Sequence, residues 1–374
     1  MDCYDPLDPN GNVTVTFDIL QWTVDGYVAR VTIQNYYQYR HVDKPGWQLG
    51  WTWTKNEVIW SMNGAFATQQ GDCSTFTSQI PHSCKIDPVI VDLLPDAANE
   101  NKSSDCCRGG LLSAWAINPL QSFSSFEITV GHLEGNTTGY IPLNLTLMAP
   151  GPGYTCGQLE DTDPTVSSVI GGRRQEQVFR TWKSSCTYSS NPVTQSDLAS
   201  KPDIVQCTDH MCPLRVHWHL KNNYKDQWRV KLTISNYNYG KSYSDWNVVV
   251  QHPGFSQSAI TYSFNSTVLP TVGITDEVAL FWGLEHYNSQ LLTADEKQPG
   301  SVTTEVLLEK DSKSFTLRNG WAFPKRIYFN GDNCEMPLPD TFPMLPNGSS
   351  NQKPTHHHFI LLFLIILTLK TLLV

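Results

Sequence analysis

The sequence predicts an all-β protein built from two antiparallel β-sandwich domains, and three observations support this prediction. Strand-like runs dominate the 374-residue chain, and helical periodicity is almost absent. Gly, Pro, Asn and Asp turns separate these runs at short intervals, as they do in β-sandwiches. Finally, RVTIQNY (30–36) resembles KLTISNY (231–237), and each is followed by a tyrosine-rich stretch and a tryptophan. This likeness predicts that the two sandwiches are related.

The predicted parts follow one another along the chain. We expect a first sandwich over 1–152, an irregular connector with cysteines and serines over 153–206, and a second sandwich over 207–335. A proline-rich stalk and spacer at 336–358 and a hydrophobic tail at 359–374 complete the chain. The strand-like runs lie at 13–20, 27–36, 125–133, 141–148, 214–220, 228–237, 246–252, 277–284 and 326–331.

One further stretch, GWQLGWTWTKNEVIW at 46–60, contains four of the twelve tryptophans. Side chains of a strand alternate between its two faces. As a strand, this stretch therefore points Trp47, Trp51 and Trp53 to one face and polar side chains to the other. Such a row of indoles is either buried in a core or offered as a flat surface to a ligand.

Charge, cysteines and sequons indicate an extracellular protein. The net charge is −9 and no basic run is present, so we expect no nucleic-acid partner. Ten dispersed cysteines and six Asn-x-Ser/Thr sequons favour an oxidising, secretory environment over free thiols and chance sequons. The adjacent Cys106 and Cys107 are expected to bond to separate partners. The predicted glycosylation sites are Asn12, Asn101, Asn136, Asn144 and Asn265.

The C-terminus matches a glycosylphosphatidylinositol (GPI) attachment signal. Asn347, Gly348 and Ser349 are candidate attachment residues, and a polar spacer and the apolar tail 359–374 follow them. A genuine transmembrane or tail-anchored helix is the alternative, although 16 residues are few for a span. The first residues, MDCYDPLDPNG, contain no apolar signal-peptide core, yet this tail argues against a cytosolic protein. We therefore expect the protein at the extracellular face of the plasma membrane.

Five segments spread through most of the chain form a recognisable set: YDPLDPNGN (4–12), EVIWSMNGAFATQQGDCS (57–74), CCRGG (106–110), CTDHMCPLRVHWHLKNNYKDQWRVKLTISN (207–236) and GWAFPKRIYFNGDNC (320–334). Together they resemble the plant COBRA-like family, which includes brittle-stalk-type proteins. The resemblance implies an extracellular, GPI-anchored glycoprotein with an N-terminal carbohydrate-binding-module-like domain, which acts in cellulose deposition and oriented cell growth, with the cell wall as a further location. TWKSSCTYS (181–189) departs from the family pattern, because no Cys-Cys-Val-Ser block follows it.

The preferred binding site is an exposed aromatic platform. Aromatic side chains stack on the apolar faces of sugar rings, and neighbours on one strand face lie roughly 7 Å apart, a spacing suited to a flat polysaccharide. Trp51 and Trp53 are the expected platform, with Trp47, Tyr37 and Tyr39 as flanks. For any single tryptophan, burial in the core is the competing interpretation.

No catalytic residue, metal site or cofactor is predicted. Acidic residues are dispersed, and no GxSxG elbow, HExxH helix or phosphate-binding loop is present. His217 and His219 share a strand face, and Cys207, His210 and Cys212 lie upstream, so a zinc site could be drawn. Disulfides and an ordinary polar strand face are the stronger interpretation of these residues in a secreted chain.

The sequence supplies a candidate platform and an anchor signal, and the resemblance implies the rest: a non-enzymatic, GPI-anchored protein that binds cellulose or a related β-glucan and assists microfibril deposition. A surface glycoprotein with a structural or protein-binding role, its tryptophans forming a core, is the alternative. A carbohydrate-active enzyme with an unrecognised site is a third.

Overall fold

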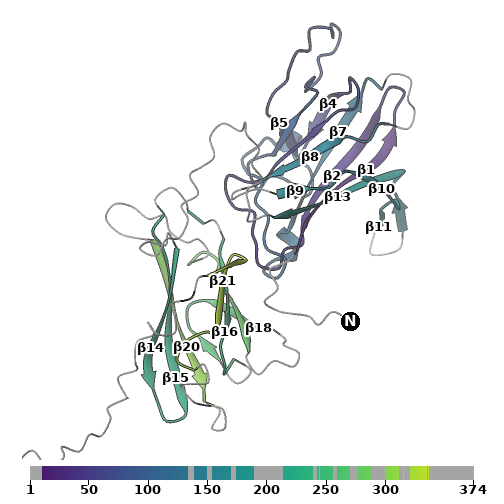
Figure 1. The fold of residues 1–374 in the computed structure, drawn as a ribbon. Helices are drawn as coiled ribbons and strands as arrows, with labels where there is room; N and C mark the ends of the chain where they lie inside the picture. The colour runs from purple at the N-terminus through teal and green to yellow at the C-terminus, as the bar shows by residue number, and fades with distance from the viewer. Residues whose placement is uncertain are drawn as a thin grey trace, which may run out of the picture. The chain divides into compact units, whose positions relative to one another are not determined.

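The computed structural model confirms an all-β protein of antiparallel sheets (Figure 1). Besides strands and turns, the described residues form two 3-10 helices, η1 (Asn99–Asn101) and η2 (Pro119–Gln121). No helix in this part of the chain is long and apolar enough to cross a membrane. The structure describes residues 11–133, 139–149, 154–169, 174–188, 214–238, 242, 243, 245–255, 259–269, 277–288, 300–310, 315, 321–334 and 336.

The first sheet of the N-terminal sandwich has the strand order β10-β13-β1-β2-β7-β4, and β9 also pairs with β13. Alternation places Val15, Phe17 and Ile19 of β1 in the core. The strands of this sheet are β1 (Val13–Trp22), β2 (Tyr27–Asn35), β4 (Val58–Asn63), β7 (Phe123–Gly131), β9 (Tyr154–Cys156), β10 (Glu160–Thr162) and β13 (Arg180–Tyr188).

The second sheet of this sandwich has the order β5-β6-β3-β8. Its β3 contains part of the tryptophan stretch and pairs with β6 on one side and β8 on the other. Side chains of both sheets meet in one hydrophobic cluster, which contains Phe17 from the first sheet and Leu49 from the second. The strands are β3 (Gln48–Thr52), β5 (Ala65–Ala67), β6 (Val89–Asp92) and β8 (Leu143–Met148).

The predicted boundary between this sandwich and a connector at 153 is wrong. Strand β13 pairs along β1, with Val13 opposite Cys186 and Phe17 opposite Trp182, so residues up to 188 belong to the first sandwich. The physical reason is alternation, because β13 buries Trp182, Ser184 and Cys186 on one face. Strands β11 (Val166–Val169) and β12 (Arg174–Gln177) form a separate two-stranded hairpin.

The second sandwich lies within the predicted range 207–335. One sheet has the order β14-β15-β20-β17 and the other β18-β19-β16-β21-β22. The strands are β14 (Leu214–Asn223), β15 (Gln227–Asn236), β16 (Asn247–Gln251), β17 (Ile260–Thr261), β18 (Asn265–Leu269), β19 (Val278–Trp282), β20 (Gly300–Glu309), β21 (Arg326–Phe329) and β22 (Asp332–Asn333).

The two sandwiches have the same topology, as the repeated motif predicts. In chain order, β1 to β8 correspond to β14 to β21: β1-β2-β7-β4 matches β14-β15-β20-β17, and β5-β6-β3-β8 matches β18-β19-β16-β21. The first hairpin also agrees in register. Val13 pairs with Asn35, and Leu214 pairs with Asn236, each 201 positions further along, and the β-bulge recurs at the same place.

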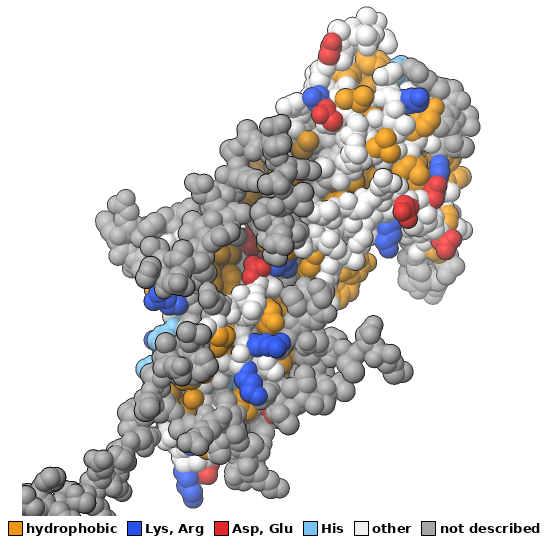
Figure 2. Space-filling model, in the orientation of Figure 1, with side chains coloured by type: hydrophobic (Ala, Val, Ile, Leu, Met, Phe, Trp, Pro, Cys, Tyr) orange, Lys and Arg blue, Asp and Glu red, His pale blue; other side chains and the backbone are white. Residues whose placement is uncertain are grey.

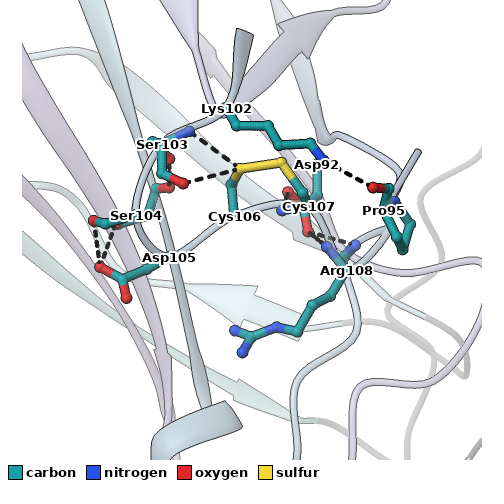
Figure 3. Close-up of a disulfide and its surroundings, with 11 residues drawn as sticks. Asp92, Pro95, Lys102, Ser103, Ser104, Asp105, Cys106, Cys107 and Arg108 are labelled. Carbon is teal, nitrogen blue, oxygen red and sulfur yellow. Dashed lines mark hydrogen bonds between the residues drawn. A yellow bond between two sulfur atoms is a disulfide. The ribbon is translucent and has the colours of Figure 1, made fainter. Parts of the chain in front are cut away.

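Three disulfides lie among the described residues: Cys73–Cys84, Cys106–Cys107 and Cys156–Cys186. The expectation of separate partners for Cys106 and Cys107 is therefore wrong, since the two bond to each other (Figure 3). Sequence spacing could not decide this pairing. Some predictions fall outside the described residues, namely the stalk except for residue 336, the tail, the attachment residues Asn347, Gly348 and Ser349, the sequon at Asn136, and Cys207, His210 and Cys212.

Candidate functional site

The predicted aromatic platform is wrong, because its three indoles are buried. Trp47, Trp51 and Trp53 are only 1%, 2% and 2% exposed. The rings pack against other aromatic side chains of the core, Trp51 edge-on against Phe17 at 5.4 Å and Trp47 stacked with Phe126 at 5.9 Å between centroids. The predicted alternation is present, but the tryptophan side of β3 points inward. Burying the indoles yields more hydrophobic free energy than burying the polar side chains on the other side of the strand would.

The two tyrosines expected to flank the platform are buried as well. The Tyr37 hydroxyl accepts a hydrogen bond from the Tyr188 backbone N–H at 2.6 Å, and burial raises the pKa of Tyr37. Tyr39 is 3% exposed and clusters with Val249 and Leu280. Neither ring can stack on a polysaccharide in this conformation, so neither belongs to a binding surface.

The opposite face of β3 points away from the core and forms the candidate site, with Gln48 and Thr52 half-buried and Gly50 buried between the neighbouring strands. Gln48, Gly50 and Thr52 point outward from this strand, and directly paired residues of antiparallel neighbours share that face. Val91 and Met148 lie opposite Gln48, while Val89 and Thr146 lie opposite Gly50. We call this surface the four-strand face, and its members are Gln48, Gly50, Thr52, Phe66, Val89, Val91, Leu143, Thr146 and Met148.

Apolar side chains dominate the four-strand face and are unusually exposed. Phe66, Leu143 and Met148 are 42%, 49% and 45% exposed, and Val89 is also open to solvent. They come from three strands, β5, β6 and β8, on either side of β3. Figure 2 shows hydrophobic side chains at the surface in the region of β5 and β8. A contiguous exposed apolar patch of this kind marks a binding surface more often than an accident of folding.

At Gly50, in the middle of the four-strand face, no side chain protrudes from the sheet. A Cβ atom there would lie 2.7 Å from the Thr146 hydroxyl oxygen, so only glycine leaves room for that hydroxyl against the strand. Gln48, Thr52 and Thr146 supply hydrogen-bonding groups among the apolar side chains. With strands about 4.8 Å apart, the four strands span roughly 14 Å, which is wide enough for a flat ligand.

One end of the four-strand face is fixed by a carboxylate and a disulfide loop. The buried Asp92 at the end of β6 accepts hydrogen bonds from the backbone N–H groups of Cys107, Arg108 and Gly110 at 2.9–3.0 Å (Figure 3). Three donors to one carboxylate order the loop that contains the Cys106–Cys107 disulfide. This loop also holds the start of β3, because the Trp47 N–H donates to the Gly110 carbonyl at 3.0 Å.

The corresponding surface of the second sandwich is covered. There β16 takes the place of β3, and Val249 and Leu280 are fully buried with Tyr39 from the loop after β2. Ala116 and Ile117 pack against the same cluster. Both sandwiches therefore have an apolar face on this sheet, but only that of the first is open among the described residues.

Two further tryptophans and the candidate histidine pair lie away from the four-strand face. Trp22 packs partly buried against the core, and Trp60 is half-buried beside Phe76. His217 and His219 do share a strand face, with ring centroids 5.8 Å apart. Within the described ranges, no group of three potential metal ligands occurs.

Four of the predicted glycosylation sites lie in the described part of the chain, and whether they carry glycans stays a prediction. Asn101 and Asn144 are exposed, whereas Asn12 and Asn265 are half-buried. The Asn265 side-chain amide donates a hydrogen bond to the Gly283 carbonyl at 3.0 Å. Asn144 lies in β8 beside the four-strand face, with a backbone φ of 50°.

The residues of the four-strand face were not predicted from the sequence, because the indoles on the other side of β3 give the stronger aromatic pattern. The available signal was the other half of the same alternation, in which a glycine interrupts the polar side chains of β3. Phe66 gave a weaker signal, as an aromatic residue in a short run of small residues, NGAFAT (63–68).

Comparison with known proteins identifies relatives over almost the whole chain. The COBRA N-terminal domain model matches residues 27–189, and the COBRA family C-terminal domain model matches residues 150–343. COBRA-like protein 1 of Oryza sativa subsp. japonica is 46% identical over 93% of this chain and 89% of its own length. COBRA-like protein 2 of Arabidopsis thaliana is 47% identical over 94% and 90%. Protein COBRA of Arabidopsis thaliana is 43% identical over 98% and 91%.

A search of solved structures found a cupin 2 conserved barrel domain protein from Leptotrichia buccalis with a TM-score of 0.11 and 7% identity. A similarity this low carries no argument about fold or function.

Proposed function

Because the chain belongs to the COBRA family, we propose that it is a non-enzymatic protein of the plant cell surface that binds cellulose or a related β-glucan and assists microfibril deposition. The single observation that carries the proposal is the open four-strand face, where Phe66, Leu143 and Met148 are exposed around the flat centre at Gly50. The binding surface is thus the outer side of the strand whose inner side contains the tryptophans.

The chemistry of the four-strand face suits a flat, neutral sugar chain. The C–H faces of the glucose rings lie on Phe66, Leu143 and Met148, whose contact removes apolar area from water. Hydroxyls at the rim of the chain exchange hydrogen bonds with Gln48 and Thr146. No charged side chain belongs to this face, which matches an uncharged polymer and gives no advantage to a charged one.

The same face argues for binding without cleavage. Hydrolysis of a glycosidic bond by the usual mechanism needs two carboxyl groups about 5–10 Å apart across the bond. None of the residues of the four-strand face carries a carboxylate, and Asp92 at its end is buried and bonded to three backbone N–H groups. A glucan on this face therefore meets no acid–base pair.

A lipid anchor would place this surface where glucan chains emerge. Cleavage after Asn347, or at Gly348 or Ser349, would remove the apolar tail and attach a GPI lipid. Confinement at the membrane raises the effective concentration of a weak binder near nascent chains. Release of the protein from intact cells by phosphatidylinositol-specific phospholipase C tests the anchor separately from glucan binding.

Retention on cellulose tests the binding surface. The full chain in mild detergent is mixed with microcrystalline cellulose, and the bound fraction is compared for wild type, Phe66→Ser and the triple variant Phe66→Ser, Leu143→Ser, Met148→Ser. Phe179→Ser is the matched control, since Phe179 is also exposed but lies outside the four-strand face, between β12 and β13. We expect a several-fold loss for Phe66→Ser, near-complete loss for the triple variant and no change for Phe179→Ser.

Equal retention of all variants would contradict the proposed surface, and no retention of the wild type would contradict the function itself. In the second case, the open apolar face would instead belong to an interface with a protein partner, which is the alternative function expected from the sequence.

A further inference from the structure

The second sandwich has a surface that concentrates positive charge, although the whole chain has a net charge of −9. Arg215, His217 and His219 alternate along β14, and all three are exposed. Figure 2 shows blue and pale-blue side chains on the side where β14 lies. We call this surface the basic face, and its members are Arg215, His217, His219, Lys221, Arg229 and Lys231.

Strand register places these side chains on one continuous surface. His219 pairs with Lys231, and Lys231 pairs in turn with Glu305 of β20. His217 pairs with Thr233, whose hydroxyl lies 2.9 Å from that of Thr303. The third row across the same strands contains Arg215, Ser235 and Ser301.

The charge of the basic face is only partly compensated. Glu305 forms ion pairs with both Lys221 and Arg229, and these hydrogen bonds lower the pKa of Glu305. Among the described residues, Arg215 and Lys231 form no ion pair. Glu309 of β20 is exposed on the same face, opposite Gln227. Four Lys and Arg side chains therefore share this face with two carboxylates and two histidines.

The first sandwich has no cation at the positions of Arg215, His217 and His219. Because the hairpins β1-β2 and β14-β15 agree in register, Thr14, Thr16 and Asp18 are the counterparts of these three residues. Thr14 and Asp18 are buried, and the Asp18 carboxylate accepts a hydrogen bond from the Thr181 hydroxyl at 2.7 Å. The first sandwich therefore does not share the exposed basic side chains of β14.

We propose that the basic face binds an acidic polysaccharide, a linear polymer of uronic acid residues. Alternate residues on a strand lie about 7 Å apart, so Arg215 and Lys221 place cations at the two ends of a row along β14. The imidazoles of His217 and His219 lie between them as hydrogen-bonding groups for the sugar units of an extended row of carboxylates. The hydroxyls of Thr233, Thr303 and Ser235 lie beside this row and can bond to sugar hydroxyls. A row along one strand fits a single polymer chain better than it fits a membrane surface, which would contact a broader area.

This site lies on a different sandwich from the four-strand face and does not depend on it. Occupation of both sites would let one molecule contact a neutral and an acidic polymer at the same time.

Binding of the full chain to polygalacturonate tests the proposal. The full chain in mild detergent is titrated with de-esterified polygalacturonate at 50 mM and 500 mM NaCl, with fully methyl-esterified polymer as the neutral comparison. The test variant combines Arg215→Thr, His217→Thr and His219→Asp, the residues that the first sandwich has at these positions. Arg30→Thr is the matched control, because Arg30 is the counterpart of Lys231 in the first sandwich.

The proposal predicts binding of the acidic polymer at low salt, at least a tenfold loss at high salt through screening, and no binding of the esterified polymer. The triple variant loses at least tenfold in affinity with an unchanged melting temperature and unchanged retention on cellulose, while Arg30→Thr binds like wild type. Three results would overturn it: no wild-type binding at low salt, equal binding by the triple variant, or tighter binding to RNA or to phosphatidylserine nanodiscs than to polygalacturonate.

Discussion

Truncation of Trp51 separates a core role from a ligand-binding role for the indoles of β3. The ring is 2% exposed and lies edge-on against Phe17 and Trp53, with 5.4 Å between centroids in each case. Replacing a buried aromatic side chain by alanine removes transfer free energy and leaves a cavity, at a cost of about 3–5 kcal/mol. A domain of this size loses roughly 2–4 °C of melting temperature per kcal/mol, so Trp51→Ala should melt about 6–20 °C lower.

This prediction is tested by the melting temperature from scanning calorimetry together with the fraction of protein retained on cellulose. Trp51→Phe, which keeps a ring in the same place, should lose less than half as much stability. Well below its melting temperature, Trp51→Ala should still be retained on cellulose, because the four-strand face lies on the other side of the strand. A variant with an unchanged melting temperature that had lost cellulose retention would refute the reasoning, since only a surface indole behaves in that way.

Three further predictions concern a buried carboxyl, a loop and a glycan. Burial and the nearby Asp43 raise the pKa of Asp245 to about 6; the folded chain binds this proton more tightly than the unfolded chain, so stability falls as pH rises from about 4 through 6. At pH 7.5, Asp245→Asn should therefore raise the free energy of unfolding by at most about 3 kcal/mol and raise the melting temperature with it. At pH 3.5 the substitution should change neither, and an equal effect at both pH values would contradict this. Asp92→Ala leaves three N–H groups without their acceptor and should cost about 3 kcal/mol or more in denaturant unfolding, whereas a loss below 1 kcal/mol would show that water replaces the carboxylate. A glycan at Asn144 would border the four-strand face, so Asn144→Gln should lower the intact mass by one glycan and increase retention on cellulose; decreased retention would show that the glycan assists binding.

The nine predicted strand-like runs all coincide with strands, because alternation and turn residues are local signals, whereas β20 was not predicted. The repeated RVTIQNY and KLTISNY motif also predicted the duplication, since its shared pattern of apolar and polar residues makes β2 and β15 equivalent central strands. Its asparagines, Asn35 and Asn236, are both fully buried at the ends of these strands. The connector was misjudged because its loop-like composition beyond residue 188 hid the alternation of β13.

The candidate site could not be predicted because alternation fixes which side chains share a face but not which face points inward. That choice depends on the opposing sheet, where Phe17 and Phe126 supply an aromatic core for the indoles. The Cys106–Cys107 pairing was likewise beyond sequence reasoning, since it depends on the loop that Asp92 orders.

Hydroxyl-radical footprinting of the full chain with and without a soluble cello-oligosaccharide tests the central claim most directly. Phe66 and Met148 react readily when exposed, and the proposed surface predicts that the sugar protects both of them while Phe179 reacts at the same rate. Protection that is absent from Phe66 and Met148 but present at another exposed aromatic residue, such as Tyr287, would place the glucan elsewhere and contradict the four-strand face as its binding surface.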